Sequence, residues 1–352
     1  MKTYYFIPIF TLFIAVFTSC STDVDLYAEY KDVPIIYAML DSRADTNYVK
    51  ITRAFCGTND NLIDANEVAL ITDSSNYLEK LDVRFVELKS TNGNSYEPTG
   101  RVLILDTLTI HNKEEGIFYA PDQILYYTAE HLNTGTGGNK YGYQLIAVKP
   151  DGDTVTAKTI MVGNEEFSIE TGGVSFQQDH SDILAKIVFR ADGEAPIYDI
   201  RMQFNYLEQH EGQEMKSKNI SRSFGTKPIS YYEKVPKTEN SYFQEYSVNW
   251  LFNTLEDAIG GDTVVDANHP NVVRYIDDFV ISISAGGDEL NYYYLANQAQ
   301  INSPVSLITP YTNIEGGYGL FSSRTTIKKV VRLSSSCKRD LFSVSAWGFK
   351  ED

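Results

Sequence analysis

The chain has 352 residues, with 47 acidic and 30 basic side chains and a formal net charge of −17. A surface of that sign repels phosphate backbones, which argues against nucleic-acid binding and against electrostatic attachment to anionic headgroups. Tyrosine (25) and phenylalanine (18) far outnumber tryptophan (2) and methionine (5). These residues suit pleated, half-buried surfaces, so the composition favours a mainly all-β fold.

The first segment has the order of an export signal. One basic residue, Lys2, precedes the uncharged and mostly apolar run Tyr4 to Thr18. This run is shorter than the roughly 20 apolar residues that span a bilayer. The pattern therefore predicts a removable signal peptide over residues 1–19 and not a permanent membrane span.

The leader ends at Cys20, in the sequence Phe17-Thr18-Ser19-Cys20. This sequence resembles the lipobox of bacterial lipoproteins, although Phe17 stands where Leu is usual, and the resemblance implies that Cys20 is acylated and becomes the mature N-terminus. An ordinary buried or free thiol is the alternative. Stable attachment needs two or more acyl chains, and the resemblance implies more than one.

A polar tether over residues 20–31 follows the cysteine. Its acidic residues Asp23 and Asp25 resemble the surface-export signal of Bacteroidota lipoproteins, with a merely solvated tether as the alternative. The expected location is the outer membrane, lipid-anchored, on the cell surface or at the periplasmic face.

Short alternating segments then follow one another up to residue 162. Val33 to Asp41 and Tyr48 to Phe55 alternate with period two, which predicts strands. The run 122–132 fits both helix and strand spacing, and its neighbours favour a strand. Asp151-Gly152 between two alternating runs predicts a tight hairpin turn. About seven strands predict an immunoglobulin-like β-sandwich over residues 32–162.

The remaining residues, 163–352, restart the strand pattern. About 330 mature residues exceed what one core usually serves, so we expect a second β-sandwich-like domain. Two short helices interrupt it. One covers 253–261, with Thr254 spaced to form a capping box with Asp257, and the other covers 287–304, where Asp288 can cap the first turn.

Two cysteines remain besides Cys20. An exported compartment permits a disulfide between Cys56 and Cys337. Separate buried thiols are the favoured alternative, because the two residues fall in different predicted domains and free cysteine is among the most buried residue types.

No pattern in the chain indicates catalysis, a cofactor or a metal. The five histidines are scattered without metal-ligand spacing. Ser334 to Ser336 lack the glycines of a hydrolase elbow. Asp277 and Asp278 are adjacent on an extended strand, so they point to opposite faces. The tyrosines at 231–232 and 292–294 could expose their rings to a sugar ligand, but packing in strands and at domain seams is the favoured explanation. The sequence therefore predicts a protein that is not an enzyme.

The segment Tyr311 to Arg324 is rich in glycine at Gly316, Gly317 and Gly319. A phosphate-binding loop needs a helix after its glycines, whereas a strand follows here. We therefore expect a glycine bulge that leads into a core strand.

Several segments together carry a resemblance to a known family. They are the lipobox, the strand Asp45 to Phe55, the strand 279–284 with its tyrosine-rich helix, and the segment that contains Asn313, Gly316, Gly317 and Gly319. They resemble the domain of unknown function 4249, a family of Bacteroidota outer-membrane lipoproteins encoded beside TonB-dependent receptors. The resemblance covers nearly the whole chain, and its motifs are structural, with no catalytic residues to carry over.

The resemblance implies a function as well as a fold. It implies an immunoglobulin-like first domain and a second β-rich domain, in agreement with the strand pattern. We expect a lipid-anchored accessory or binding protein that works with a TonB-dependent receptor in nutrient uptake, with a small-molecule, peptide or glycan ligand. The alternative is an adhesin or fimbrial-type subunit, although residues 20–31 contain no arginine for a trypsin-like processing enzyme.

Overall fold

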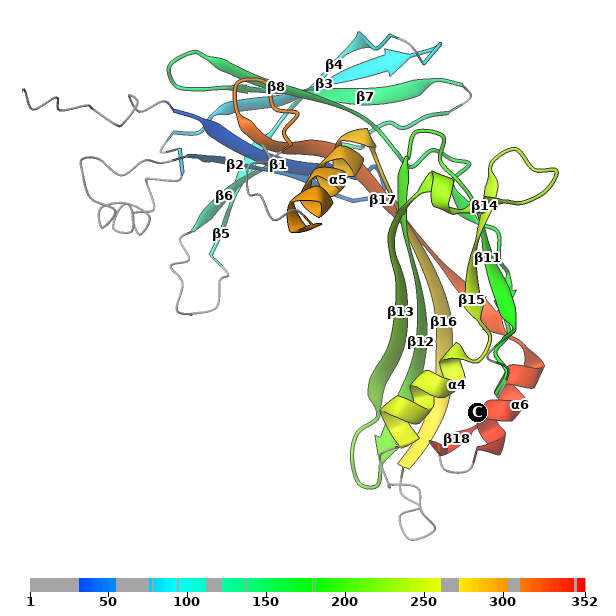
Figure 1. Ribbon diagram of the computed structural model, residues 1–352. Helices are drawn as coiled ribbons and strands as arrows, with labels where there is room; N and C mark the ends of the chain where they lie inside the picture. Colours follow the sequence, from blue (N-terminus) through cyan, green and yellow to red (C-terminus); the bar gives the residue numbers. More distant parts are fainter. Residues whose placement is uncertain are drawn as a thin grey trace, which may run out of the picture. The chain divides into compact units, whose positions relative to one another are not determined.

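The fold is known from a computed structural model (Figure 1). The structure describes residues 32–54, 76–77, 79–93, 95–111, 122–136, 138–178, 180, 182–260, 272–302, 311–344 and 347–351. The predicted signal peptide, the tether, Cys20 and Cys56 lie outside these residues. Val33–Asp352 form one compact unit. Among the described residues, no helix combines the length and the apolar character needed to cross a membrane.

The first part of the chain folds as a β-sandwich, which has eight strands in the residues that the structure describes. Their order along the chain is β1 (Pro34–Leu40), β2 (Asn47–Arg53), β3 (Asp82–Ser90), β4 (Glu97–Ile104), β5 (Asp106–Ile110), β6 (Gln123–Thr128), β7 (Lys140–Val148) and β8 (Thr154–Ile160). One sheet has the order β1-β2-β6-β5 and the other β4-β3-β7-β8. This is the two-sheet strand arrangement of immunoglobulin domains, so the predicted immunoglobulin-like sandwich is confirmed.

Local sequence explains several of these strands. The run 122–132, whose spacing fits both helix and strand, contains strand β6 (Gln123–Thr128), as the neighbouring strands indicated. Between β7 and β8, Gly152 takes a positive φ of 89°, and its N–H donates to the carbonyl of Lys149 at 2.9 Å. This confirms the predicted Asp151-Gly152 turn, because glycine adopts such a φ without steric cost.

The second part of the chain forms another two-sheet sandwich. Its smaller sheet has the order β14-β15-β11-β9, with β9 (Ser168–Ile169), β11 (Leu184–Arg190), β14 (Glu233–Lys234) and β15 (Ser241–Ser247). Its larger sheet contains β12 (Ile197–His210), β13 (Lys216–Pro228), β16 (Val272–Gly286) and β17 (Tyr318–Leu333), with the short strands β10 (Gly173–Val174) and β18 (Phe349–Lys350) at its margins. The all-β prediction with a second sandwich-like part is therefore confirmed.

Three α-helices accompany these sheets in the described residues, one more than the sequence predicted. They are α4 (Trp250–Leu255), α5 (Asp288–Asn302) and α6 (Ser335–Ser343). Helix α6 was missed, although Ser334 caps it by accepting a hydrogen bond from the Cys337 N–H at 3.2 Å.

The predicted start of the first helix was wrong. Helix α4 begins at Trp250, and the Thr254 hydroxyl donates to the Trp250 carbonyl inside the helix at 2.8 Å, so Thr254 does not cap it. A π-helical turn over Glu256–Gly260 continues it. Burial of Leu251 and Leu255 in the core decides where this helix lies, which a capping pattern cannot show. Helix α5 lies where it was predicted, but Asp288 is its first helical residue and not its cap. Gly287 stands at the N-cap, and its carbonyl accepts the first hydrogen bond, from the Asn291 N–H.

Strand β17 connects the two sandwiches. Its residues from Tyr318 to Ser323 pair in parallel with β1, and those from Arg324 to Val331 pair antiparallel with β16. The result is one continuous sheet of order β13-β12-β16-β17-β1-β2-β6-β5 (Figure 1).

The described residues form two hydrophobic cores. The first contains core residues up to Met161, and the second begins at Val162. Ile314 and Phe321 belong to the first core, although they lie near the end of the chain. Residues 311–323, which the sequence assigns to the second domain, therefore contribute to the first sandwich. The division at residue 162 itself stays a prediction.

Candidate ligand-binding groove

The outer face of the large sheet carries a hollow of about 730 Å³, which we call the polar groove. Strands β12, β13, β16 and β17 form its floor, and Leu290 of α5 contributes to its wall. Its polar lining residues are Asp199, Arg201, Gln203, Asn205, Thr226, Ser282, Ser284, Arg324, Thr326 and Lys328.

The alternation of the strands explains this lining. In β12, Ile200, Met202 and Phe204 are fully buried in the second core, so Arg201 and Gln203 between them point to the opposite face. The same alternation in β17 buries Ile327 and turns its neighbours Thr326 and Lys328 into the groove.

The strand register aligns the polar side chains in rows across the groove. Arg201 lies opposite Ser282, and Ser282 lies opposite Lys328. In the next row, the hydroxyls of Ser284 and Thr326 are 2.8 Å apart. The floor of the groove therefore presents hydroxyls between charged groups, beside the apolar lining residues Val280 and Leu290.

The groove is locally cationic in an acidic chain. It contains three cations and one carboxylate, and that carboxylate, Asp199, already pairs with Arg201 at 2.9 Å. Within the part of the chain that the structure describes, neither Arg324 nor Lys328 forms an ion pair. Their charges are therefore available to an anionic ligand.

A second hollow of about 420 Å³ lies on the same sheet, over β1, β2 and β6, and Arg324 lines both hollows. Two exposed tyrosines border it, Tyr37 at 48% and Tyr48 at 43% exposure, and we call this pair the tyrosine ledge. Tyr37 lies opposite Leu320 of β17, which has the same orientation along that strand as Arg324. The ledge and the polar groove thus share one face of the sheet.

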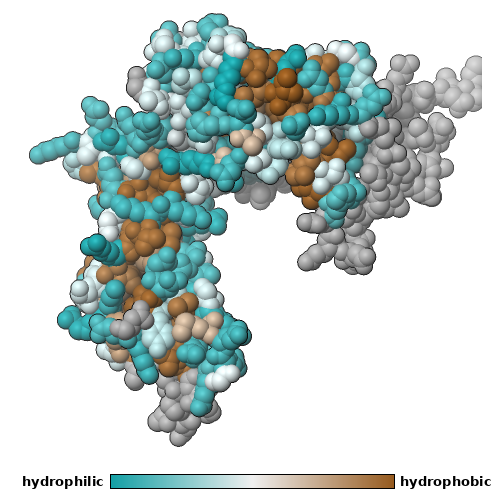
Figure 2. All heavy atoms as spheres, turned by 180° about the vertical axis from the view of Figure 1, so that it is seen from behind, coloured by the Kyte–Doolittle hydropathy of each residue, from teal (hydrophilic) through white to brown (hydrophobic). Residues whose placement is uncertain are grey.

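Exposed apolar groups do not single out another site on the side of the molecule that Figure 2 shows. Hydrophobic and hydrophilic residues are interspersed there in several separate patches. The most exposed large apolar side chains, Ile104 and Val330, lie on strands of different sheets.

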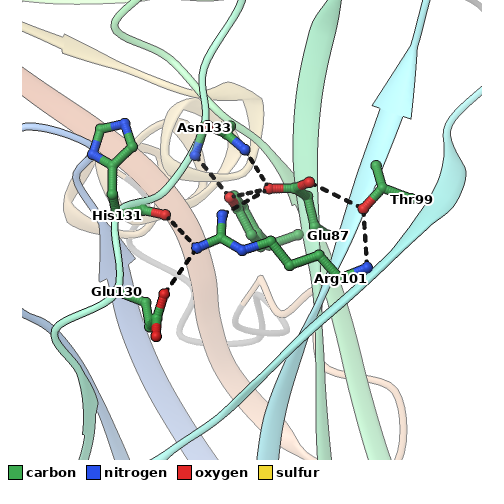
Figure 3. A network of polar contacts seen from close by, with 7 residues as sticks. Glu87, Thr99, Arg101, Glu130, His131 and Asn133 are labelled. Atoms are coloured by element: carbon green, nitrogen blue, oxygen red, sulfur yellow. Dashed lines mark hydrogen bonds and ion pairs between the residues drawn. The ribbon is translucent and has the colours of Figure 1, made fainter.

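A buried polar network surrounds Glu87 inside the first sandwich (Figure 3). The Glu87 carboxylate, whose residue is 4% exposed, accepts hydrogen bonds from Thr99 at 3.0 Å, Arg101 at 3.1 Å, Asn133 at 2.7 Å and Tyr143 at 3.0 Å. Burial by itself raises the pKa of Glu87, but these hydrogen bonds outweigh it and hold the pKa below the ordinary value of 4.5.

The same network fixes the loop before β7. The Tyr143 hydroxyl accepts from the Asn133 N–H at 2.8 Å while it donates to Glu87. Arg101 reaches the same loop, where it donates to the His131 carbonyl at 2.9 Å and pairs with Glu130 at 3.2 Å. A hydrogen bond between the hydroxyl of a strand tyrosine and a backbone group several residues earlier in the chain is the tyrosine corner of immunoglobulin-like domains. A carboxylate saturated in this way is a structural group and not a proton-transfer group.

Two of the glycines in the segment 311–324 lie where backbone atoms of β1 approach closely. A Cβ on Gly319, whose φ is 119°, would lie 1.9 Å from the Ile36 carbonyl oxygen, and one on Gly317 would lie 2.5 Å from that of Pro34. Gly316 also has a positive φ, of 83°. The Asn313 side chain donates to the Phe321 carbonyl at 2.7 Å and accepts from the Phe321 N–H at 3.0 Å. These residues dock β17 against β1.

The remaining residues that the sequence singled out do not form a common site. Cys337 is a free thiol, fully buried in the second core. Cys56 lies outside the described residues, so a disulfide between the two stays a prediction. His111 lies beside Asp122 at 3.0 Å and His210 beside Glu208 at 3.1 Å, while His269 lies outside the described residues. Among those residues, no three His, Cys, Asp or Glu side chains are placed to hold a metal ion.

The two tyrosine runs are divided between packing and surface. Tyr231 is exposed whereas Tyr232 is buried. Tyr292 is exposed and lies 5.8 Å from the ring of Tyr311, and Tyr294 donates to the Thr226 carbonyl at 3.2 Å. Neither run lines the polar groove. The cations that do line the groove are Arg201, Arg324 and Lys328. The sequence did not single them out. Its only signal for them was that every second residue of β12 and β17 tends to be polar.

Comparisons with known proteins add little. No family model matches the chain, and no curated protein does. Among solved structures, the calcium binding domain CBD12 of CALX1.1 matches with 8% identity over 85% of this chain and 99% of that one, at a TM-score of 0.17. A TM-score that low carries no argument about function.

Proposed function

We propose that this chain is a lipid-anchored, non-catalytic binding protein of the outer membrane, and that its polar groove takes a ligand that a TonB-dependent receptor imports. One observation carries the binding role. Arg324 and Lys328 are held on an open sheet face, and neither has an ion-pair partner among the described residues. The surface of the groove is thus opposite in sign to the chain as a whole.

A non-catalytic role is supported by the chemistry of the buried carboxylates. The Glu87 carboxylate already accepts hydrogen bonds from four donors. Glu289 of α5 is held by the hydroxyls of Thr159 at 2.8 Å and Ser322 at 3.2 Å, at the junction of α5 with β8 and β17. Neither group lines the polar groove, where a general acid or base would have to reach a bound ligand. The carboxylate that does line it, Asp199, is paired with Arg201 at 2.9 Å.

The membrane anchor rests on the lipobox sequence that ends at Cys20. Fatty chains on that cysteine would keep the groove close to the membrane in which the receptor lies. The effective concentration of the groove at the receptor would then be high without a tight contact between the two proteins.

The experiment is a comparison of native cells with cells that carry Cys20→Ser. We expect the native protein in the outer-membrane fraction with an acylated N-terminus, recovered together with a TonB-dependent receptor after mild crosslinking. The Cys20→Ser protein should leave the membrane fraction. Unacylated native protein, or recovery without any receptor combined with normal growth of the deletion strain on every nutrient tried, would contradict the proposal.

An adhesin or fimbrial-type subunit remains the alternative function. Such subunits polymerise by exchange of an edge strand, whereas β1 is already paired on both sides, with β2 and with β17. Exchange at β1 would have to displace the strand that joins both sandwiches. Intact monomers on cells would argue against this alternative.

A further inference from the structure

We infer that the ligand of the polar groove is an anionic oligosaccharide, with acidic groups over Arg324 and Lys328 and a sugar ring against the tyrosine ledge. This inference deepens the proposed function and rests on it. Four features of the groove support it: the spacing of its cations, the rows of hydroxyls between them, the paired backbone beneath them, and the position of Arg324 between two hollows.

The cations are spread over the groove. Arg324 and Lys328 are four residues apart on β17, which places their Cα atoms roughly 13 Å apart along the strand. The Cα atom of Arg201, two strands from Lys328 in the same row, lies roughly 10 Å away from that of Lys328. A single phosphate or carboxylate would contact all three only if these long side chains converged on one point, so a ligand with several acidic groups along an extended chain matches them better.

The groups between the cations match sugar hydroxyls. The Ser282 hydroxyl can donate and accept, and the Ser284 and Thr326 hydroxyls, which share one hydrogen bond, keep one donor and further acceptor sites between them. Gln203 adds an amide that donates one hydrogen to Asn205 and has a second hydrogen and its oxygen left for a ligand. A sugar ring presents hydroxyls on the same length scale, and each can both donate and accept. The rows therefore complement the neutral part of an acidic sugar as well as its charge.

An acidic peptide fits this face less well. Peptides commonly bind sheets by adding a strand to an open edge, where backbone groups are free. Strands β12 and β16 pair with a neighbour on both sides, and residues 324–331 of β17 pair with β16. The groove lies over the face of these strands, where a ligand meets side chains and not backbone groups, so a peptide in it would gain no main-chain hydrogen bonds.

Arg324 joins the charged surface to an aromatic one, because it lines both hollows. On the far side of it, Tyr37 and Tyr48 keep 48% and 43% of their surface exposed. A tyrosine ring combines a broad apolar face with a hydroxyl, which suits the apolar face of a sugar ring next to its hydroxyls. A ligand that crosses Arg324 can therefore use charge on one side and ring contact on the other.

The test measures binding to the detergent-solubilised, full-length protein by calorimetry with three probes. They are a galacturonate oligomer, a neutral galactose oligomer of the same length, and an aspartate peptide of the same net charge. We expect the galacturonate oligomer to bind at least tenfold more tightly than either of the others, and to lose affinity as salt rises. Arg324→Ala and Lys328→Ala should each lower that affinity tenfold or more, and Tyr37→Ala several-fold.

Two variants serve as matched controls. Arg332→Ala removes a cation from the same strand outside the groove, and Tyr231→Ala removes an exposed tyrosine outside the ledge. Both should leave the affinity unchanged, and thermal unfolding should show all five variants folded at the temperature of the titration.

The outcomes separate this inference from the proposed function. Equal binding of the neutral oligomer or of the aspartate peptide, or loss of affinity in the control variants, would overturn the inference. The inference would also be overturned if none of the three probes bound to a protein that still copurifies with its receptor. That result would leave the proposed function standing. The proposed function itself would be overturned if no receptor were recovered with the native protein after crosslinking and the deletion strain showed no growth defect on any nutrient tried.

Discussion

The two halves of strand β17 differ in what surrounds their side chains. Residues 318–323 lie against β1, where Gly319 has no room for a Cβ and Ser322 and Ser323 are fully buried. Beyond them, Arg324 and Lys328 point into an open groove, and Val330 is 64% exposed. One continuous strand thus changes from a tightly packed segment to an accessible one within a few residues.

The hydroxyls show the same difference. Ser323 donates to the Ile160 carbonyl at 2.5 Å and accepts from the Val162 N–H at 3.1 Å, at the point where the two cores meet. Thr325 donates to Asp41 at 3.0 Å. Thr326, by contrast, contacts only the Ser284 hydroxyl among the hydrogen bonds found for its side chain in the described residues. The buried hydroxyls of Ser323 and Thr325 hold the fold together, whereas the hydroxyl of Thr326, on the outer face of the strand, remains available for a ligand.

Gly319→Ala should have the largest effect on this strand. Its Cβ would lie 1.9 Å from the Ile36 carbonyl oxygen, and its φ of 119° is strained for any side chain. Because the obstructing atom is backbone, β1 and β17 must separate, and we expect a loss of more than about 4 kcal/mol in unfolding free energy, or failure to fold. Chemical denaturation measures the loss.

Gly152→Ala is the matched control for that substitution. Gly152 also has a positive φ, of 89°, but a Cβ there would meet nothing within 4 Å. Only backbone strain remains, so the cost should be about 1–2 kcal/mol. Equal losses in the two variants would show that the close approach of β17 to β1 does not matter.

Asn313→Ala should have the next largest effect. It removes both side-chain hydrogen bonds to the backbone of Phe321, whose side chain is fully buried in the first core. Leaving two buried backbone groups unpaired costs about 3 kcal/mol. Asn313→Asp keeps the acceptor oxygen but loses the N–H donor, so its unfolding free energy should lie between those of Asn313→Ala and the native chain. A loss below about 1 kcal/mol for Asn313→Ala would contradict this role.

The pH dependence of stability should reveal Glu289, which accepts from Ser322 of β17. Burial raises the pKa of Glu289 above 4.5, and the nearby charge of Asp288 adds to this, while hydrogen bonds offset it only in part. The folded state then retains a proton that the unfolded state releases, so unfolding free energy falls as pH rises from 4.5 through the raised pKa. Below 4.5 the contribution is fully present.

Glu289→Gln removes this titration. We expect urea unfolding of that variant to lose less stability than the native chain over the same rise in pH. Identical slopes in the two proteins would contradict the assignment. Lys158→Gln, on the exposed face of β8, is a suitable charge-change control that should leave the slope unaltered.

Thr326→Val should have the smallest effect on stability. The side chain lies on the open face of β17 and loses one hydrogen bond to Ser284, so the change should stay within about 0.5 kcal/mol. Ser323→Ala, three residues earlier, should cost about 2 kcal/mol because it leaves buried backbone groups without partners. Similar losses at both positions would remove the distinction between the two halves of the strand.

Much of the fold was predictable because strands and turns have local patterns. Period-two alternation located β1 and β2, Asp151-Gly152 located the turn between β7 and β8, and the tyrosine-rich segment located α5. Helix α4 was misplaced because buried Leu251 and Phe252 decide its position, and α6 was missed although Ser334 caps it. Packing outweighed the local capping pattern in the first case.

The polar groove was not predictable from the chain. Its cations come from β12 and β17, whose alternation gives each strand a polar face without saying which strands lie side by side. Arg201 and Lys328 share a row only because β16 pairs with both strands in the observed register. The glycines at 316, 317 and 319 showed that something approaches closely, but not that it is β1.

The sequence by itself determined what depends on neighbouring residues: the acidic charge, the short strands and their turns, and the need for glycine before β17. The export signal that ends at Cys20 stays a prediction from the same kind of local pattern. The tertiary structure alone decided that β17 pairs in parallel with β1 and continues beside β16, so that one sheet carries both the tyrosine ledge and the polar groove. Pairing between strands far apart in the chain depends on backbone hydrogen bonds that every residue can make. It leaves no local pattern, and only packing of the two cores selects it.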